Sequence, residues 1–283
     1  MKQPLRSGLL ACSAVLALLM PVGLAPALLW QAALTPSAVA APGPRFARFG
    51  GVSPSADARH LADWVADSGD NAGAGFVIVD KKFATLYVFD AGATLRGTSP
   101  VLLGAAVGDD SVPGIGTRPI AQVLPHERTT PAGRFMAERG HNALGRDVVW
   151  LDYDAAVSIH RVVTRNAHER RLQRLASRTA DDKRISYGCI NVPAAFYESH
   201  IRPTFATGRA PVYVLPEIKP MQQVFGSYDV ASAHRPGAGR SAAAATAGRH
   251  VVDREGLAHA MPLPWMYSTR NPKLEYPNAA SER

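Results

Sequence analysis

The sequence predicts a mainly β domain with short helices. Runs of β-branched, aromatic and small apolar residues recur between turn-forming residues, which is the pattern of strands separated by turns. Helical periodicity is brief, and its clearest segment is 166–177. Strands are predicted at 76–79, 85–89, 100–107, 148–151, 156–163 and 211–215, with a further strand entered through 130–135.

Each element has its own local signal. The runs 76–79 and 85–89 flank a two-lysine turn, so they predict a hairpin. The segment 108–130 is punctuated by Gly and Pro, and a long irregular segment of this kind is more often a functional loop than filler. A second short helix is predicted over 193–201, because its first residue is a proline, which a first helical turn tolerates.

The 166–177 segment predicts an amphipathic helix capped by Asn166. We expect Leu172, Leu175 and Ala176 on its buried face. The rest of its surface is expected to be basic, and four arginines supply the charge: Arg170, Arg171, Arg174 and the adjoining Arg178.

Composition divides the chain into four regions. Residues 1–40 predict a signal peptide or membrane anchor. Residues 41–73, rich in Ala, Gly, Pro, Ser and Asp, predict a linker that contains a short helix where Leu61, Trp64 and Val65 give 57–67 a weak amphipathic pattern. The folded domain is expected over 74–216, and 217–283 is expected to be a low-complexity tail.

Residues 1–40, the predicted leader, indicate the cellular compartment. A basic start is followed by a mostly apolar run, 9–34, and then by Ala38-Val39-Ala40, which favours cleavage after Ala40. The predicted location is therefore the periplasm or cell envelope. Because the apolar run is long, an uncleaved anchor that keeps the protein at the inner membrane is the alternative.

The formal net charge of +8 suits a polyanionic surrounding, namely nucleic acid, an anionic membrane or an acidic wall polymer. The sequence has no stripe of interleaved aromatic and basic residues, so we expect no nucleic-acid partner. A solvated basic surface is the plainer alternative.

Cysteine usage singles out one residue. Cys12 lies in the leader, so cleavage leaves Cys189 alone and no internal disulfide can form. A lone thiol in an oxidising compartment is buried, paired with another chain or used chemically. The count leaves a buried core cysteine and a reactive one as alternatives.

The surroundings of Cys189 favour a nucleophile. His160 ends a mostly apolar predicted strand, so a rigid scaffold would aim its imidazole as the base that ionises Cys189. Gly188 permits a tight turn, and the amides of Gly188 and Cys189 are candidate donors to an oxyanion.

Other chemistries lack their motifs. The sequence contains neither the Ser-x-x-Lys of penicillin-binding enzymes nor the Gly-x-Ser-x-Gly of α/β-hydrolases. Walker and dinucleotide glycine patterns are missing, as are a close Cys pair and the helical zinc spacing of histidines. We therefore expect no cofactor and no metal.

Ser186-x-Gly188-Cys189-Ile190-Asn191, with a strand histidine upstream, resembles the L,D-transpeptidase (YkuD-like) catalytic domain. The resemblance covers roughly 75–216 and includes the opening hairpin, 76–89, and the Thr-Pro-Ala-Gly-Arg-Phe segment, 130–135. It implies a β-sandwich of mixed sheets with the cysteine in a cleft.

The resemblance also implies a reaction on peptidoglycan stem peptides. Cys189 would attack the carbonyl of the L-centre of meso-diaminopimelate and release the terminal D-alanine. The resulting thioester would pass to an amine on a second stem. Ser186, Asn191 and the backbone around Arg161 would position the dyad and the donor.

The sequence departs from this family pattern in three ways. Tyr187 replaces a histidine, Arg161 stands where a small residue is common, and the insert between His160 and Cys189 is long and basic. The alternatives are an L,D-carboxypeptidase or hydrolase, with water as acceptor, and a catalytically silent wall-binding protein. A further hypothesis is that the basic helix lies over the cleft and meets stem carboxylates.

Overall fold

A computed structural model describes residues 43–235, so the predicted leader and most of the predicted tail lie outside the described residues. No helix within this part of the chain is long and apolar enough to cross a membrane. The strands are β1 Phe76–Asp80, β2 Thr85–Phe89, β3 Leu95–Pro100, β4 Leu103–Gly104, β5 Gly133–His141, β6 Asp147–Asp152, β7 Val157–Arg161, β8 Arg184–Ser186, β9 Ile190–Val192 and β10 Ala210–Val214.

The helices are short except for the first, α1 Ala56–Ser68. The remaining α-helices are α2 Arg171–Ala176, α3 Ala194–Phe196, α4 Arg202–Thr204, α5 Met221–Phe225 and α6 Val230–Ala233. Single turns are η1 Ile115–Thr117, η2 Ile120–Gln122, η3 Pro125–Glu127, η4 Ala167–Glu169, η5 Asp181–Lys183 and the π-helical η6 Tyr197–Ile201, which joins α3 to α4.

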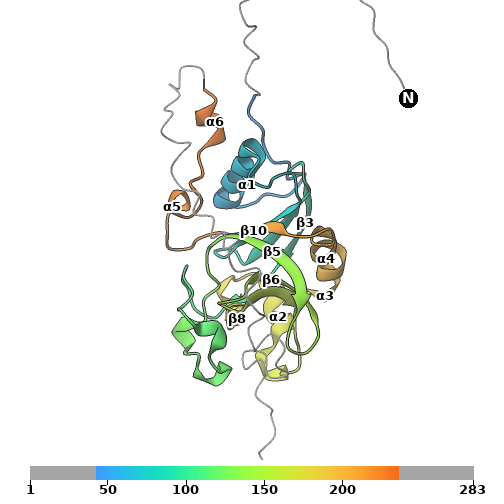
Figure 1. Cartoon of the computed structure of the whole chain (residues 1–283), viewed down its shortest axis with the longest axis vertical. Coiled ribbons are helices and arrows are strands. Elements are labelled where there is room, and N and C mark those ends of the chain that lie inside the picture. Colours follow the sequence, from blue (N-terminus) through green and yellow to red (C-terminus); the bar gives the residue numbers. More distant parts are fainter. Residues whose placement is uncertain (1–42, 236–283) are drawn as a thin grey trace, which may run out of the picture. The chain divides into compact units, whose positions relative to one another are not determined.

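Eight strands form one mixed sheet in the order β3-β2-β1-β10-β5-β6-β7-β9, and β4 pairs separately with β8. Leu102, which follows β3, exchanges two backbone hydrogen bonds with Asn191 of β9, each 2.9 Å long. The two ends of the sheet are thereby linked. Figure 1 shows the strands lying between α1 and α2. The predicted class, mainly β with mixed pairing and short helices, is confirmed.

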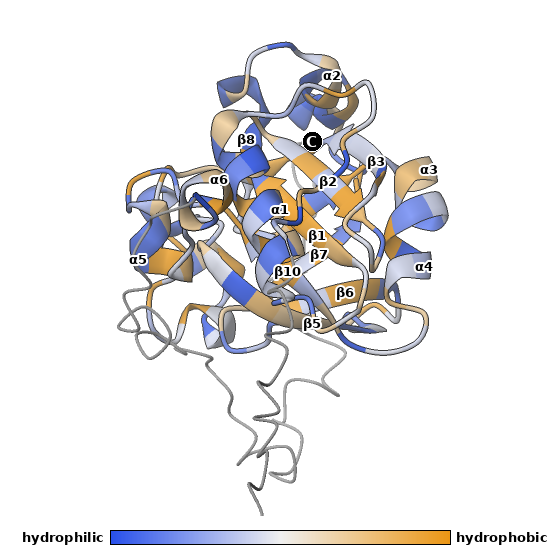
Figure 2. Ribbon diagram, turned by 90° about the horizontal axis from the view of Figure 1, so that it is seen from above, coloured by the Kyte–Doolittle hydropathy of each residue, from blue (hydrophilic) through white to orange (hydrophobic). Residues whose placement is uncertain are grey.

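The central strands are buried on both faces, which explains their nearly continuous apolar sequences. Figure 2 shows these strands in orange, with blue stretches on α1, α2 and α5. One cluster fills the inside of the sheet and includes Val77, Val79, Leu86, Val88, Val212, Val214, Ile159, Ile190 and Val192. The other lies beneath α1 and α5 and includes Phe76, Ile78, Tyr87, Phe89, Tyr213, Leu61, Val65, Met221 and Phe225.

Residues at both ends of the predicted domain belong to its core. The Ser55 hydroxyl accepts from the Ala58 amide at 3.1 Å and starts α1, and Gly69 ends it in a left-handed conformation. The short helix predicted within 57–67 is confirmed by α1, but its apolar stripe covers the outer face of the sheet, so this part of 41–73 belongs to the core and is not a linker. Met221, Phe225 and Val230 are also buried, so the tail begins later than predicted.

Two further predictions are corrected. The strand expected at 100–107 is displaced, because β3 pairs with β2 along Leu95–Pro100 and the chain then turns away to Asn191 and β8. The helix expected at 166–177 is broken at Arg170, whose φ is 47°, and only its second part forms α2. Asn166 does cap the first turn, accepting from the His168 amide at 3.1 Å.

The predicted buried face of this helix is confirmed for Leu175 but is wrong for Leu172 and Ala176. Leu172 is 60% exposed, whereas Arg171 and Leu175 are buried. Arg171 turns inward because its guanidinium donates to the Glu169 carboxylate and to the Asn191 side chain. A buried charge needs such partners, and these two override the local apolar pattern.

Candidate active site

His160 and Cys189 lie on neighbouring parallel strands. The register of β7 and β9 pairs Ile159 with Ile190 and His160 with Asn191. Residues two apart on a strand share a face, so His160 and Ser158 lie on one face of β7, beside Asn191 and Cys189. The fold therefore brings His160 and Cys189 onto neighbouring segments of the chain, although the basic insert separates them in sequence.

The Cys189 thiol is only partly buried. Its sulfur lies 3.4 Å from the Ala156 carbonyl, to which the thiol donates, and 3.7 Å from the Ser158 hydroxyl. The alternative of a fully buried core cysteine therefore does not apply. Ser158 was not among the predicted site residues. Because side chains alternate along a strand, its position two residues before His160 could have indicated that both lie on the same face of β7.

Two contacts fix the orientation of His160. Its Nδ1 lies 2.8 Å from the Arg161 carbonyl oxygen, and its Nε2 lies 3.3 Å from Asn191 Nδ2. A carbonyl oxygen only accepts, so Nδ1 carries the proton, and the Nε2 lone pair faces the amide N–H. The ring is thus assigned as neutral, with its basic nitrogen on the side of Asn191.

Asn191 is fully buried and contacts both halves of the site. Its Nδ2 lies 3.3 Å from the Cys189 carbonyl as well as 3.3 Å from His160. Its Oδ1 accepts from Arg171 Nη1 at 2.6 Å. Asn191 therefore lies where a residue that positions the dyad is expected.

Ser186 organises the turn that carries the cysteine. Its hydroxyl donates to the Cys189 carbonyl at 2.6 Å and accepts from the Gly188 amide at 3.1 Å. The Gly188 amide is thus engaged within the turn, and the prediction that it points at an oxyanion is wrong. Gly188 has a φ of 128°, and a Cβ there would lie 2.7 Å from the Thr129 carbonyl oxygen, so only glycine fits.

The side chains of Tyr187 and Arg161 face other partners. The Arg128 guanidinium lies 4.1 Å from the centre of the Tyr187 ring. Arg161 Nε donates to Glu198 at 2.6 Å, and its guanidinium lies 4.0 Å from the centre of the Tyr197 ring. Arg161 therefore meets His160 through its backbone carbonyl.

A cavity of about 180 Å³ adjoins His160. Its walls include the apolar Leu144, Val162, Val163 and Ala194, and the basic Arg146 and Arg165. Neither arginine forms an ion pair with another described residue. The nearby Asp147 is engaged by Arg139 and Tyr197; although burial would raise its pKa, these hydrogen bonds lower it. Asp147 itself lines the cavity, so three arginines, Arg146, Arg161 and Arg165, meet one ionised carboxylate there, and the lining is net positive.

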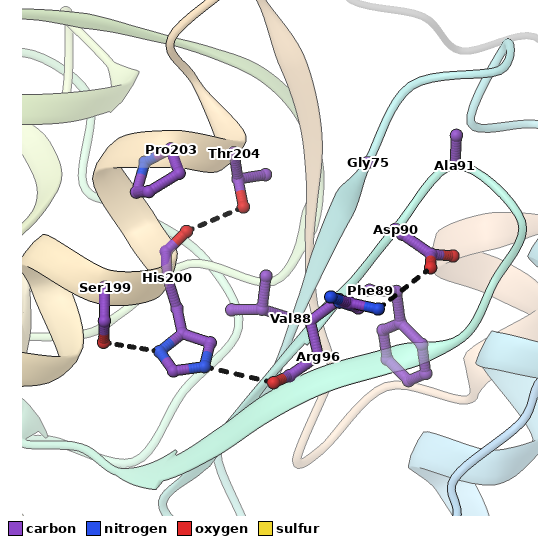
Figure 3. Close-up of a pocket in the computed structure, with 10 residues that line it drawn as sticks. All are labelled: Gly75, Val88, Phe89, Asp90, Ala91, Arg96, Ser199, His200, Pro203 and Thr204. Carbon is purple, nitrogen blue, oxygen red and sulfur yellow. Dashed lines mark hydrogen bonds and ion pairs between the residues drawn. The ribbon is translucent and has the colours of Figure 1, made fainter.

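A larger cavity of about 450 Å³ lies elsewhere and contains none of the predicted site residues. Figure 3 shows His200 at its wall, bonded to the Ser199 hydroxyl and the Arg96 carbonyl. Within residues 43–235, no group of three or more His, Cys, Asp or Glu side chains is placed to hold a metal ion.

No protein-family model and no curated protein matches the chain. The solved structures that resemble it include L,D-transpeptidases. The catalytic domain of the E. faecium L,D-transpeptidase is 16% identical, with a TM-score of 0.30, and the alignment covers 50% of this chain and 98% of that one. Mycobacterium tuberculosis L,D-transpeptidase 1 is 17% identical, with a TM-score of 0.27 and coverages of 50% and 61%.

The helical cell shape determining protein Pgp2 from Campylobacter jejuni is 16% identical, with a TM-score of 0.34 and coverages of 56% and 57%. The chain thus spans about three fifths of the length of the Mycobacterium and Campylobacter proteins. The geometry of the site, rather than these distant likenesses, carries the proposal that follows.

Proposed function

We propose that the protein is an exported cysteine L,D-transpeptidase that acts on peptidoglycan stem peptides. The observation that supports the proposal is the parallel pairing of β7 with β9, which brings the strand of His160 next to the segment that carries the partly buried Cys189, with Asn191 in contact with both residues. A nucleophile, an adjacent base and a group that orients the base are the parts that covalent acyl transfer requires.

The proposed reaction has two halves. His160 Nε2 takes the thiol proton, and Cys189 Sγ attacks the carbonyl carbon of the L-centre of the donor stem. Collapse of the tetrahedral intermediate breaks the amide bond, and His160 returns the proton to the departing D-alanine amine. The amine of a second stem then attacks the thioester and gives its proton to His160, and the thiol is restored as the new amide forms.

The cavity beside His160 supports a stem peptide as substrate. His160 exchanges protons with the leaving amine and with the incoming one, so both amines must approach its ring. In a D-amino acid the carbon next to this amine carries a carboxylate. Arg146 and Arg165 would meet that carboxylate, while Val162, Val163 and Ala194 would contact the side chain.

Carbapenem acylation tests the nucleophile. Intact mass measured after carbapenem treatment is expected to show one covalent adduct on the full chain and none on Cys189→Ser. His160→Gln is expected to slow acylation by about 10²–10⁴-fold, the usual contribution of a general base. An adduct that persists on Cys189→Ser, or no adduct on the folded wild type, would overturn the proposal.

Purified muropeptides with a labelled amine then identify the acceptor. Incorporation of the label into a tetrapeptide stem is the expected product of a transpeptidase. Release of D-alanine without incorporation would instead identify an L,D-carboxypeptidase, and no turnover together with wall binding would identify a silent binding protein.

A further inference from the structure

A chain of hydrogen bonds runs from the basic insert to the proposed base. Arg171, the first residue of α2, donates from Nη1 to Asn191 Oδ1 at 2.6 Å. Asn191 Nδ2 lies 3.3 Å from His160 Nε2, and His160 Nδ1 lies 2.8 Å from the Arg161 carbonyl oxygen. Arg171 is 4% exposed and Asn191 is fully buried, so solvent does not compete for these bonds.

The arginine fixes the polarity of this chain from one end, and the carbonyl oxygens of Cys189 and Arg161 agree with it. A guanidinium has donors only, so the side of the Asn191 amide that faces it must be the oxygen. The NH₂ group is then turned toward His160, and Nε2 must accept. With Nε2 unprotonated, Nδ1 carries the proton and donates to the Arg161 carbonyl.

We propose that Arg171 is a positioning residue that sets the tautomer of His160 through Asn191. Its relevance to catalysis rests on the proposed function, because only the Nδ1–H tautomer leaves a lone pair on Nε2, which takes the Cys189 proton once the contact with the Asn191 N–H is given up. Without a donor at Arg171, only the contact of Nδ2 with the Cys189 carbonyl, 3.3 Å long, holds the amide in this orientation, and a rotated amide offers its oxygen to Nε2. That arrangement favours the Nε2–H tautomer, which has no lone pair at the position of the base.

The surroundings of Arg171 suit this role. Glu169 accepts from Arg171 Nε and supplies the opposite charge, and it lies in η4 just before the left-handed Arg170. The break at Arg170 turns the next residue inward, toward β9, rather than outward with Leu172. The same insert thus carries exposed arginines and one buried arginine, and only the buried one contacts Asn191.

The ¹⁵N shifts of the His160 ring nitrogens test the inference on the full chain, at a pH where the ring is neutral. The wild type is expected to show the proton on Nδ1. Arg171→Lys keeps a donor-only side chain and should retain this tautomer, whereas Arg171→Met should populate Nε2–H. Arg178→Met, which removes an exposed arginine of the same insert, is the matched control and should change nothing.

Asn191→Asp is a second variant, in which residue 191 still offers an oxygen that accepts from Arg171. A carboxylate only accepts, so this change should place a proton on His160 Nε2. A ring that stays Nδ1–H with Nε2 unprotonated in Arg171→Met or in Asn191→Asp would overturn the inference.

Carbapenem acylation separates this inference from the proposed function. Arg171→Met is expected to slow acylation about 10–100-fold, part of the contribution of a general base, and Arg171→Lys should restore most of the rate. An unreactive wild type whose tautomer still follows residue 171 would refute the transpeptidase and leave the positioning role standing. Normal acylation by Arg171→Met with an unchanged tautomer would refute the positioning role alone.

Discussion

The Thr130 hydroxyl donates to the Gly188 carbonyl at 2.9 Å, across 58 residues of sequence. The same oxygen accepts from the Gly104 amide at 2.9 Å. One buried hydroxyl thus joins the end of the 108–130 loop, β4 and the turn that carries Cys189.

Thr130→Val is expected to loosen this turn. Valine keeps the shape but leaves a buried carbonyl and a buried amide without their partner, which costs about 1–3 kcal/mol for each such group. Urea unfolding should show lower stability, and carbapenem acylation should slow. Thr130→Ser keeps the hydroxyl and is the control; equal effects of the two variants would contradict the explanation.

Gly188→Ala tests the geometry of the turn. The φ of 128° disfavours any other residue, and the new Cβ would approach the Thr129 carbonyl oxygen to 2.7 Å. We expect a loss of about 1–3 kcal/mol in the free energy of unfolding, the usual cost of a strained residue, together with loss of acylation. Gly51→Ala, where no atom lies within 4 Å of the added Cβ, should be neutral in both assays.

A buried ion pair anchors the loop behind the site. Lys81 Nζ lies 2.8 Å from Asp109 and 2.9 Å from the Thr130 carbonyl, and Glu217 lies 3.5 Å from the same nitrogen. Burial would raise the pKa of Asp109, but hydrogen bonds from Lys81 and from three backbone amides lower it to about 2. The ionised carboxylate therefore stabilises the fold.

The sign of the pH dependence follows from this lowered pKa. The stabilisation by Asp109 is complete above the ordinary pKa of 3.8 and is lost as the pH falls toward about 2. Asp109→Asn should cost about 3–5 kcal/mol at neutral pH, because it breaks a buried pair, and should remove this part of the acid sensitivity. Asp110→Asn breaks an exposed pair with Lys219 and should cost less than about 1 kcal/mol. An equal loss in the free energy of unfolding for Asp109→Asn and Asp110→Asn, measured by urea titration, would refute this account.

The cavity beside His160 predicts a preference among acceptors. Arg146→Gln and Arg165→Gln should each raise the KM for a D-amino-acid amine by about tenfold, equivalent to about 1.4 kcal/mol. An acceptor whose carboxylate is amidated should not be affected. Arg209→Gln, on the opposite side of β5 near Glu138, is the charge control. An equal rise in KM for the free and the amidated acceptor would show that Arg146 and Arg165 do not bind the acceptor carboxylate.

Local sequence predicted most of the sheet. The runs now seen as β1, β2, β6, β7 and β10 are β-branched or aromatic, so each strand carries its own signal. The predicted strand 156–163, which carries His160, is confirmed by β7, and Gly188 indicated the tight turn before β9. The parallel register of β7 and β9 has no local signal, because it depends on how the whole sheet is ordered.

The buried arginine shows why the rest was not predictable. Arg171 stands among exposed arginines, and nothing nearby in sequence distinguishes it from Arg170 or Arg174. Its burial depends on Glu169 and on Asn191 of another strand, and such partners appear only after folding. The packing of α1 was not predicted for a similar reason: its apolar stripe is weak, and the outer face of the sheet that it covers forms only when distant strands pair.

The backbone bridge between Leu102 and Asn191 has a consequence for biogenesis. It joins segments far apart in the chain, and contacts of this kind are the slow ones to form during folding. Until Leu102 docks, one edge of β9 is open and Asn191 lacks the anchor that holds it beside the His160 ring and the Cys189 carbonyl. A newly made chain would therefore hold His160 and Cys189 without the ordered residue that contacts both, and their arrangement would be complete only when the two ends of the sheet are joined.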